Sequence, residues 1–251
     1  MRVSGKGLIN RETVLNFKFN GQLFQGFAGD TLASALLAND QRLVARSFKY
    51  HRPRGIMTAG SEEPNALVTI YRSGSQEPNT RATVQPLYEG LVAQPQNAWP
   101  SLKFDALGVN DFLSPFLAAG FYYKTFMWPR AFWERVYEPF IRHAAGLGAL
   151  AVAYDHDLYE KAYAHCDVLI IGAGPSGLMA ALAAARAGLD VILADENDRV
   201  GGRLLSEVEE VGSVAGHIWA EGIGAELVGL ANVKVMTNST VTGAYDQGTY
   251  G

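Results

Sequence analysis

A glycine-rich segment in the last third of the chain has the spacing of a dinucleotide-binding loop. It reads Gly172-Ala-Gly-Pro-Ser-Gly177 and directly follows the apolar run Val168–Ile171, which is typical of a strand buried in a parallel sheet. A stretch of small residues predicts a helix to about Ala187, and the apolar residues 191–194 predict a second strand. The cofactor contacts expected in this loop are Gly172, Gly174, Pro175, Ser176 and Gly177.

Each part of this strand–loop–helix segment has a physical role in binding a cofactor that contains phosphate. The first glycine, Gly172, permits a tight turn, and the second, Gly174, has no side chain to block a pyrophosphate. The third, Gly177, lets the helix pack closely against the strand. The helix N-terminus offers free amide hydrogens and a partial positive charge to the phosphates. The segment therefore predicts an ADP-containing cofactor, and the alternative is a Rossmann domain that has lost its ligand.

Two acidic residues follow the second predicted strand. Asp195 lies eighteen residues after Gly177, where a carboxylate accepts hydrogen bonds from the ribose hydroxyls of an adenosine. The same carboxylate would repel a 2′-phosphate, which disfavours NADP. We expect Asp195 and its neighbour Glu196 to face the cofactor. The choice between NAD and FAD stays open at the level of these residues.

A second glycine segment, Gly201-Gly202-Arg203, follows the acidic residues. A double glycine at this place is similar to the extension of flavoproteins with two dinucleotide-binding domains, where it continues the path of the pyrophosphate. We therefore expect Gly201, Gly202 and Arg203 to contact the cofactor. Arg199 and Arg203 are the candidate phosphate neighbours, and solvated surface arginines are the alternative.

The composition argues against several other classes of protein and site. The 251 residues carry a net charge of −4, so no basic field gathers nucleic acid. The single cysteine, Cys166, excludes internal disulfides and clusters held by several cysteines. No apolar run reaches the roughly 18–20 residues that cross a bilayer. The sequence therefore predicts a cytoplasmic protein with neither nucleic acid nor a membrane as its partner.

The remaining residues that could do chemistry are isolated from one another in the sequence. Four histidines lie singly, without the spacing of metal ligands: His143, His156, His165 and His217. We therefore predict no metal site, and we assign no catalytic acid, base or nucleophile.

The first 99 residues are expected to form an α+β module with a β-grasp, ferredoxin-like fold. Phe17 and Phe19 alternate with polar residues, and Asn20-Gly21 supplies the positive φ angles of a tight hairpin turn. The predicted elements are a β-hairpin over 14–26, a helix over 32–39 with Asp30 as its N-cap, and strands at 66–71 and 82–87.

Residues 100–165 form a segment of a different kind. Eleven aromatic residues lie between Phe112 and Phe140, and three prolines divide this stretch into short predicted helices. We expect a helical, aromatic-rich linker that packs on both flanking domains or on another subunit, with an ordinary interdomain core as the alternative. Residues 166–251 are expected to form a truncated α/β domain of the Rossmann-like type.

The end of the chain has the pattern of an interrupted domain. A third strand is predicted at 232–236, and 240–245 predicts the first arm of a hairpin whose turn is 246–248. An arm without its partner leaves backbone groups unpaired, and three parallel strands leave a doubly wound core half covered. We therefore expect Gly251 to be a truncation point in a longer subunit.

Four segments together carry a resemblance to a known family. They are 29–33 (GDTLA), 47–56 (SFKYHRPRGI), 64–68 (PNALV) and the dinucleotide loop. In this order they resemble the N-terminal part of the α subunit of heterotetrameric sarcosine oxidases. The first module also resembles the [2Fe–2S] ferredoxin domain of related amine and proline dehydrogenases, in which cysteines occupy the loop corresponding to 58–66. That loop contains no cysteine here, so the resemblance implies a module without an iron–sulfur cluster.

The resemblance implies a subunit of a complex that oxidatively demethylates sarcosine to glycine while oxygen is reduced to hydrogen peroxide. It implies β, γ and δ subunits as partners, FAD on the β subunit, FMN at the α–β interface and NAD in the dinucleotide site of the α subunit. Sarcosine and tetrahydrofolate, which takes the one-carbon unit, would bind outside these residues, so this part alone is expected to be inactive. The alternative is a non-catalytic, cofactor-binding and subunit-docking module of a related amine or proline/hydroxyproline dehydrogenase complex.

Overall fold

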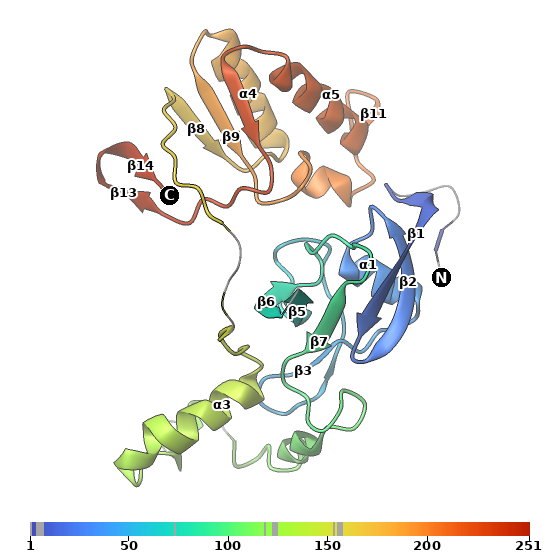
Figure 1. The fold of residues 1–251 in the computed structure, drawn as a ribbon, viewed down its shortest axis with the longest axis vertical. Helices are drawn as coiled ribbons and strands as arrows, with labels where there is room; N and C mark the ends of the chain where they lie inside the picture. The colour runs from blue at the N-terminus through green and yellow to red at the C-terminus, as the bar shows by residue number, and fades with distance from the viewer. Residues whose placement is uncertain are drawn as a thin grey trace. The chain divides into compact units, whose positions relative to one another are not determined.

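The computed structural model of the chain consists of two compact units, Met1–Asp157 and Leu158–Gly251 (Figure 1). The residues that it describes are 2–3, 8–72, 74–117, 119–121, 125–152, 154 and 158–251. Both units contain helices and strands, so the expected mixed α/β character is confirmed.

The first unit contains a five-stranded mixed sheet. Its strands, in sheet order, are β2 (Gln22–Ala28), β1 (Asn10–Phe19), β7 (Val92–Pro95), β5 (Leu67–Arg72) and β6 (Ser75–Arg81). β7 lies in the middle and runs parallel to β1, whereas the other neighbours are antiparallel. The predicted hairpin turn is confirmed, because Asn20 and Gly21 have φ angles of 49° and 76°.

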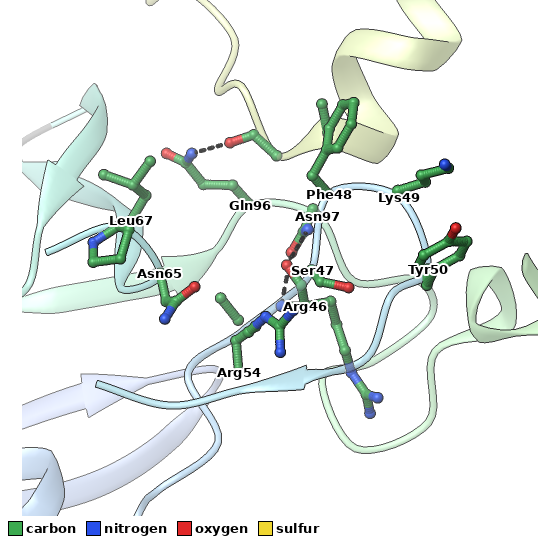
Figure 2. A pocket seen from close by; sticks show the side chains of 14 residues that line it. Arg46, Ser47, Phe48, Lys49, Tyr50, Arg54, Asn65, Leu67, Gln96 and Asn97 are labelled. Carbon is green, nitrogen blue, oxygen red and sulfur yellow. Dashed lines mark hydrogen bonds between the residues drawn. The ribbon is translucent and has the colours of Figure 1, made fainter. Parts of the chain in front are cut away.

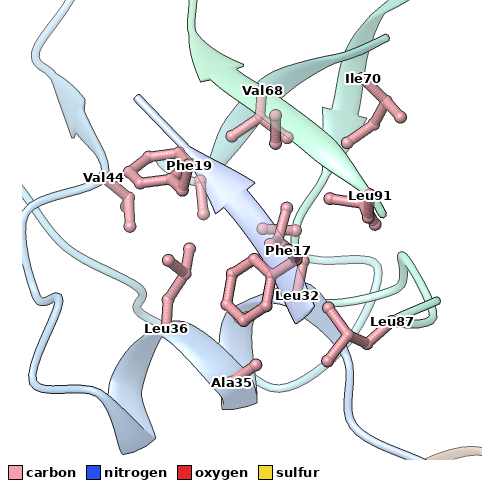
Figure 3. Close-up of a cluster of buried hydrophobic side chains, with 14 of the residues drawn as sticks. Phe17, Phe19, Leu32, Ala35, Leu36, Val44, Val68, Ile70, Leu87 and Leu91 are labelled. Carbon is pink, nitrogen blue, oxygen red and sulfur yellow. The ribbon is translucent and has the colours of Figure 1, made fainter. Parts of the chain in front are cut away.

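The core of this unit lies between the sheet and helix α1 (Leu32–Ala38), as Figure 3 shows. Phe17 and Phe19 of β1 are each 1% exposed, in keeping with their alternation with polar residues. Leu32 and Leu36 lie one helical turn apart and are fully buried in the same cluster. Burying a side chain of this size contributes about 1.5–3 kcal/mol. These contacts therefore fix the helix to the sheet.

The N-cap of α1 is Thr31, so the prediction of Asp30 was wrong by one residue. Thr31 and Ser34 form a capping box in which each hydroxyl accepts a hydrogen bond from the other's backbone N–H. Asp30 is buried beside the cap, where its carboxylate accepts from the Ser34 hydroxyl (2.6 Å) and from the Phe27 N–H (2.9 Å). It also pairs with Arg2. Asp30 thus holds the turn that precedes the helix instead of capping the helix itself.

The strand predicted at 82–87 was also misplaced. The strand of this region is β6, which ends at Arg81, and the backbone N–H groups of Val84 and Gln85 both donate to the Arg81 carbonyl in a turn. Ala82 and Leu87 are apolar because they reach the core from this turn and the segment after it. β6 itself is an edge strand with a polar sequence and no fully buried residue, so it lacks the apolar alternation that reveals a half-buried strand.

The loop before β5 closes around a buried carboxylate. Glu63 is 2% exposed, and its Oε2 accepts hydrogen bonds from the backbone N–H groups of Met57 (2.8 Å) and Thr58 (2.7 Å). Its Oε1 accepts from the N–H groups of Asn65 (2.8 Å) and Ala66 (3.2 Å). Burial raises the pKa of Glu63, but these four donors outweigh burial and hold the pKa below its usual range. The carboxylate therefore stays charged and organises its own loop.

The helices with described bounds in the aromatic segment are short. They are η1 (Ala106–Asp111), η2 (Arg130–Phe132), the π-helical turn η3 (Trp133–Tyr137) and α3 (Glu138–Ala145). Gly146, with a φ of 78°, caps α3, and the described residues between 147 and 165 contain no helix or strand. The described helical pieces of the predicted linker thus end at Ala145, about twenty residues before the predicted boundary at 165. Two of its aromatic residues, Tyr122 and Tyr123, lie outside the described residues.

The second unit is built on a parallel three-stranded sheet with the order β12–β9–β8. Its main elements are β8 (Val168–Ile171), α4 (Pro175–Arg186), β9 (Val191–Ala194), α5 (Gly216–Val228) and β12 (Val233–Met236). Both helices and the sheet share one apolar cluster, which includes Leu178, Leu193 and Leu227. The predicted strand–loop–helix–strand segment and the third strand are thereby confirmed.

Smaller elements surround this sheet. They are η4 (Gly202–Leu205), the paired strands β10 (Glu210–Val211) and β11 (Val214–Ala215), and the paired strands β13 (Ala244–Tyr245) and β14 (Thr249–Tyr250) with the turn η5 (Asp246–Gly248) between them. Ala244 pairs with Tyr250 and Tyr245 with Thr249, so the predicted hairpin arm is shorter than expected and does have a partner. The expectation that the predicted hairpin arm would lack a partner strand, one of the two reasons given for truncation at Gly251, was therefore wrong.

Candidate dinucleotide-binding site

The loop between β8 and α4 has the backbone geometry that its three glycines predict. Gly172 has a φ of 98°, which a side chain would disfavour, and its N–H donates to the carbonyl of Ala194 at the end of β9. A Cβ on Gly177 would lie 1.9 Å from the carbonyl oxygen of Gly172, so only glycine lets α4 approach the loop this closely. Pro175 occupies the first turn of α4, where its missing N–H costs nothing.

The middle glycine differs from the other two because protein packing does not require it. Gly174 has a φ of −69°, which any residue can adopt, and a Cβ there would meet no atom within 4 Å. The backbone faces open space at the N-terminus of α4, where amide hydrogens lack partners within the helix. This is the fit expected if a phosphate group approaches the backbone at Gly174.

The second glycine segment contacts the first. The Gly201 N–H donates to the Ala173 carbonyl at 2.8 Å, and a Cβ on Gly202 would lie 3.0 Å from the Cα of Gly174. Both residues have positive φ angles, 124° for Gly201 and 53° for Gly202. The structure thus brings together the two glycine segments that the sequence singled out, at the carboxyl ends of β8 and β9.

Asp195 links β9 to the glycine loop. It is 7% exposed, and its Oδ2 accepts a hydrogen bond from the Ala173 N–H at 2.5 Å. Its Oδ1 accepts from the backbone N–H and the side-chain amide of Asn197, both at 2.8 Å. A carboxylate offers about four acceptor positions. These three hydrogen bonds occupy three of them, which leaves one that could serve a ribose hydroxyl. The contact with ribose stays a prediction.

Sequence reasoning missed the residues that hold the backbone around Asp195 from the neighbouring strand. The loop after β12 lies beside this backbone, since the Ser239 N–H donates to the backbone carbonyl of Asp195 and the Asn238 N–H donates to that of Asn197. Asn238 has a φ of 51°. The sequence feature that could have revealed this loop is the cluster of polar residues directly after β12. The carboxyl ends of parallel strands meet at one edge of the sheet, so these residues must lie near the end of β9.

The charged candidates around the loop lie at the surface. Glu196 is exposed next to Asp195. Arg203 is paired with Glu207, one helical turn further on, at 2.7 Å, and Arg199 lies 3.7 Å from Asp198. The prediction of phosphate contacts for the two arginines overlooked these acidic neighbours, and the contacts stay predictions.

The described part of the chain shows neither a metal centre nor a membrane helix. No group of three or more His, Cys, Asp or Glu residues is arranged there to hold a metal ion. None of the described helices is both long and apolar enough to cross a bilayer.

Comparison with known families assigns each unit a model. Residues 12–98 match a 2Fe-2S iron-sulfur cluster binding domain, and residues 167–247 match a FAD dependent oxidoreductase. Two curated relatives are similar along almost the whole chain. The sarcosine oxidase subunit alpha of Rhizobium meliloti (strain 1021) is 57% identical over 250 residues, which are 100% of this chain. The subunit of the same name from Corynebacterium sp. (strain U-96) is 32% identical over 239 residues, or 95% of this chain.

This chain is similar in sequence to sarcosine oxidase α subunits along almost its whole length. It spans 25% of the length of the Rhizobium sarcosine oxidase subunit and 20% of the Corynebacterium one. Among solved structures, L-proline dehydrogenase from P. horikoshii has the same fold, with a TM-score of 0.54 at 20% identity over 95% of this chain and 36% of that one. The resemblance carried by the four sequence segments is thereby confirmed, and the second unit is of the FAD-dependent oxidoreductase type.

Proposed function

We propose that this chain is the cofactor-binding part of a sarcosine oxidase-type α subunit, and that its second unit binds the ADP portion of a dinucleotide between the two glycine segments. The observation that carries the proposal is the open space beside Gly174, combined with the contact of Gly201 and Gly202 with the same loop. A glycine that packing does not require is explained when a ligand approaches its backbone.

In this proposal each site residue has a defined task. The first turn of α4 offers its free backbone N–H groups, such as that of Ser176, to the pyrophosphate, while Pro175, which has no N–H, starts the helix. Gly201 and Gly202 let the second glycine segment pack closely on Leu205, Ala220 and the Gly174 backbone, while Asp195 uses its remaining acceptor position for a ribose hydroxyl. Glu196 and Arg203 line the exposed rim.

The identity of the dinucleotide is a finer part of the proposal. NAD is the cofactor that the resemblance implies, and the carboxylate of Asp195 disfavours NADP. FAD is the alternative, and it is the cofactor named by the family model that matches this unit. Both share the ADP portion, so the same residues serve either one.

The reaction proposed for the whole protein is the oxidation of sarcosine to glycine with reduction of oxygen to hydrogen peroxide, and transfer of the one-carbon unit to tetrahydrofolate. The relatives bear the name sarcosine oxidase subunit alpha, which supports this assignment and the presence of partner subunits, for which the resemblance implies β, γ and δ. We assign no catalytic residue to this chain, and we place FMN at an interface with a partner subunit and the substrate sites outside these residues. Localisation in the cytoplasm is part of the same proposal.

A role in subunit docking is the second candidate, and a separate observation favours it. Phe112, Phe116 and Trp128 are 86%, 81% and 84% exposed, far more than large aromatic side chains usually are. In this reading the chain is a non-catalytic module of a related amine or proline/hydroxyproline dehydrogenase complex. The two candidates differ in whether the bound dinucleotide takes part in turnover.

We also propose the finer fold names and boundaries. The first module, 1–99, is a β-grasp because β1 and β2 form a hairpin, α1 crosses the sheet and β7 returns parallel to β1. It holds no iron–sulfur cluster, since the single cysteine of the chain, Cys166, lies outside the matched residues 12–98. A linker follows at 100–165, and the parallel sheet at 166–251 is Rossmann-like.

The test uses the purified chain and two matched glycine variants. Thermal unfolding is measured with NAD, FAD and ADP, and a ligand present at 100 times its Kd should stabilise the fold by about 2.7 kcal/mol. Gly174→Ala should abolish the shift, whereas Gly222→Ala, which also adds a methyl group in open space, should preserve it. Flavin absorption in the visible spectrum of the isolated protein would identify FAD. The absence of any shift with all three ligands would contradict the proposal.

A further inference from the structure

The first unit contains a cavity of about 350 Å³, within the size range of small-molecule sites (Figure 2). Its walls come from the segment between the short paired strands β3 (Ala45–Arg46) and β4 (Pro53–Arg54), from the residues before β5, from the end of β7 and from the end of α3. It is made entirely of residues that the dinucleotide site does not use.

The charge of the cavity wall has one sign. Arg46, Lys49 and Arg54 line the cavity, and no acidic residue is among the lining residues that the structure describes. The whole chain has the opposite balance, with 25 acidic and 21 basic residues. A concentration of cations against this background creates a local positive potential.

Two of the three cations are held in place without being neutralised. The guanidinium of Arg46 donates to the backbone carbonyls of Leu102 and Lys103, at 2.6 to 3.0 Å. Carbonyl oxygens satisfy the donors but carry no full charge. The Lys49 ammonium lies over the ring of Tyr50, 4.9 Å from the centroid. Both residues therefore keep their positive charge beside the cavity.

Arg54 is the cation that is available to a ligand. Figure 2 shows its side chain rising from β4 toward the space between Asn65 and Ser47. No ion pair or side-chain hydrogen bond joins it to any other described residue. The nearby Arg52 differs, because its guanidinium lies 2.6 Å from the carboxylate of Asp111.

We propose that this cavity binds a small anion that carries a carboxylate or phosphate group, with Arg54 as its charge partner. The planar guanidinium can donate two parallel hydrogen bonds to either group. The Ser47 hydroxyl and the Asn65 amide lie on the wall as further hydrogen-bonding groups, and the half-exposed ring of Phe48 forms an apolar part of the rim. Gln96 and Asn97 shape the cavity and are already satisfied, through Gly146 and Arg46 respectively.

Isothermal titration calorimetry with the complete chain tests this proposal. Inorganic phosphate and acetate are titrated separately at constant ionic strength, so the two arms distinguish a phosphate site from a carboxylate site. We expect saturable binding of at least one anion in the millimolar range. Arg54→Glu should weaken it by about tenfold or more, which corresponds to about 1.4 kcal/mol.

The control variant is Arg42→Glu, which makes the same change in net charge. Arg42 is exposed, pairs with Asp40 and does not line the cavity, so its substitution should leave the affinity unchanged. Dilution heats alone for both anions would overturn the proposal. So would equal affinity in Arg54→Glu and the unmodified protein. Phosphate binding that survives Arg54→Glu but is lost in Gly174→Ala would belong to the dinucleotide loop and would overturn the proposal as well.

Discussion

The loop around Glu63 and the loop around Gly174 solve the same electrostatic problem in opposite ways. In the first, backbone N–H groups from both sides converge on a carboxylate that belongs to the chain, at distances of 2.7 to 3.2 Å. In the second, the start of α4 has no side-chain cap and the space beside Gly174 is open. A ring of amides needs a negative partner. One loop contains that partner, whereas in our proposal the other leaves its place to a ligand.

The comparison predicts that Glu63→Gln has the largest effect on stability. The amide would place an NH₂ donor against two backbone donors and would leave them unsatisfied. We expect the free energy of unfolding of the first unit to fall by about 3 kcal/mol. Urea denaturation followed by the fluorescence of the tryptophans measures it, and Glu62→Gln, an exposed neighbour, is the control. A loss as small as that of the control would show that the loop does not depend on the charge.

Gly177→Ala should have the next largest effect, and it acts on the second unit. The new methyl group would overlap the Gly172 carbonyl at 1.9 Å, so α4 must move away from β8. We expect a loss of about 2 kcal/mol, in the range of overpacked cores. Hydrogen exchange of the amides in β8 and α4 reports it locally. Unchanged exchange there would mean that the helix can shift at no cost.

A smaller effect is expected on how the stability of the first unit depends on pH in the acidic range. The pKa of Glu63 is lowered in the folded state by its backbone donors, against the effect of burial. A lowered pKa adds stability above the pKa of the unfolded state, and this contribution disappears as the pH falls through the folded pKa. Unfolding curves between neutral and acidic pH should therefore show a steeper loss of stability in the unmodified protein than in Glu63→Gln. Parallel curves would contradict this assignment.

Gly174→Ala should have the smallest effect on stability. The backbone angle suits alanine and the space around it is open, so we expect a change within about 0.5 kcal/mol. Gly222→Ala, inside α5, should instead raise stability by about 0.5–1 kcal/mol because alanine favours the helix. Equilibrium unfolding without ligand measures both. A large loss for Gly174→Ala would mean that the loop depends on this glycine for its own packing.

These two loops also mark what could be predicted from the sequence. The glycine loop follows from spacing, since Gly172, Gly174 and Gly177 carry their constraints in the local sequence. The hairpin at Asn20-Gly21 and the buried Phe17 and Phe19 follow for the same reason. Nothing local distinguishes Glu63 from Glu62, because the role of Glu63 comes from backbone groups on both sides of it that only the folded loop brings together.

The other differences have equally specific causes. Thr31 displaces Asp30 as the N-cap because Ser34 completes a capping box with Thr31. β6 lacks an apolar alternation because it is an edge strand with no fully buried residue. Ser239 and Asn238 hold the backbone of Asp195 and Asn197 from a loop that follows a third strand, about forty residues further on. Such contacts depend on strand order, which a single sequence does not reveal.

The parallel pairing of β1 with β7 has a consequence for how the chain is made. Lys18 and Phe19 pair with Val92 and Ala93, so the middle of the first sheet joins the earliest strand to one that is synthesised more than seventy residues later. The hairpin of β1 and β2 can form as soon as it leaves the ribosome, but the sheet must wait for β7. Contacts this distant in sequence slow folding, because a long loop must close before they form. β8 and β9, in contrast, pair across only 23 residues, so the glycine loop between β8 and α4 can take shape soon after its own strands emerge.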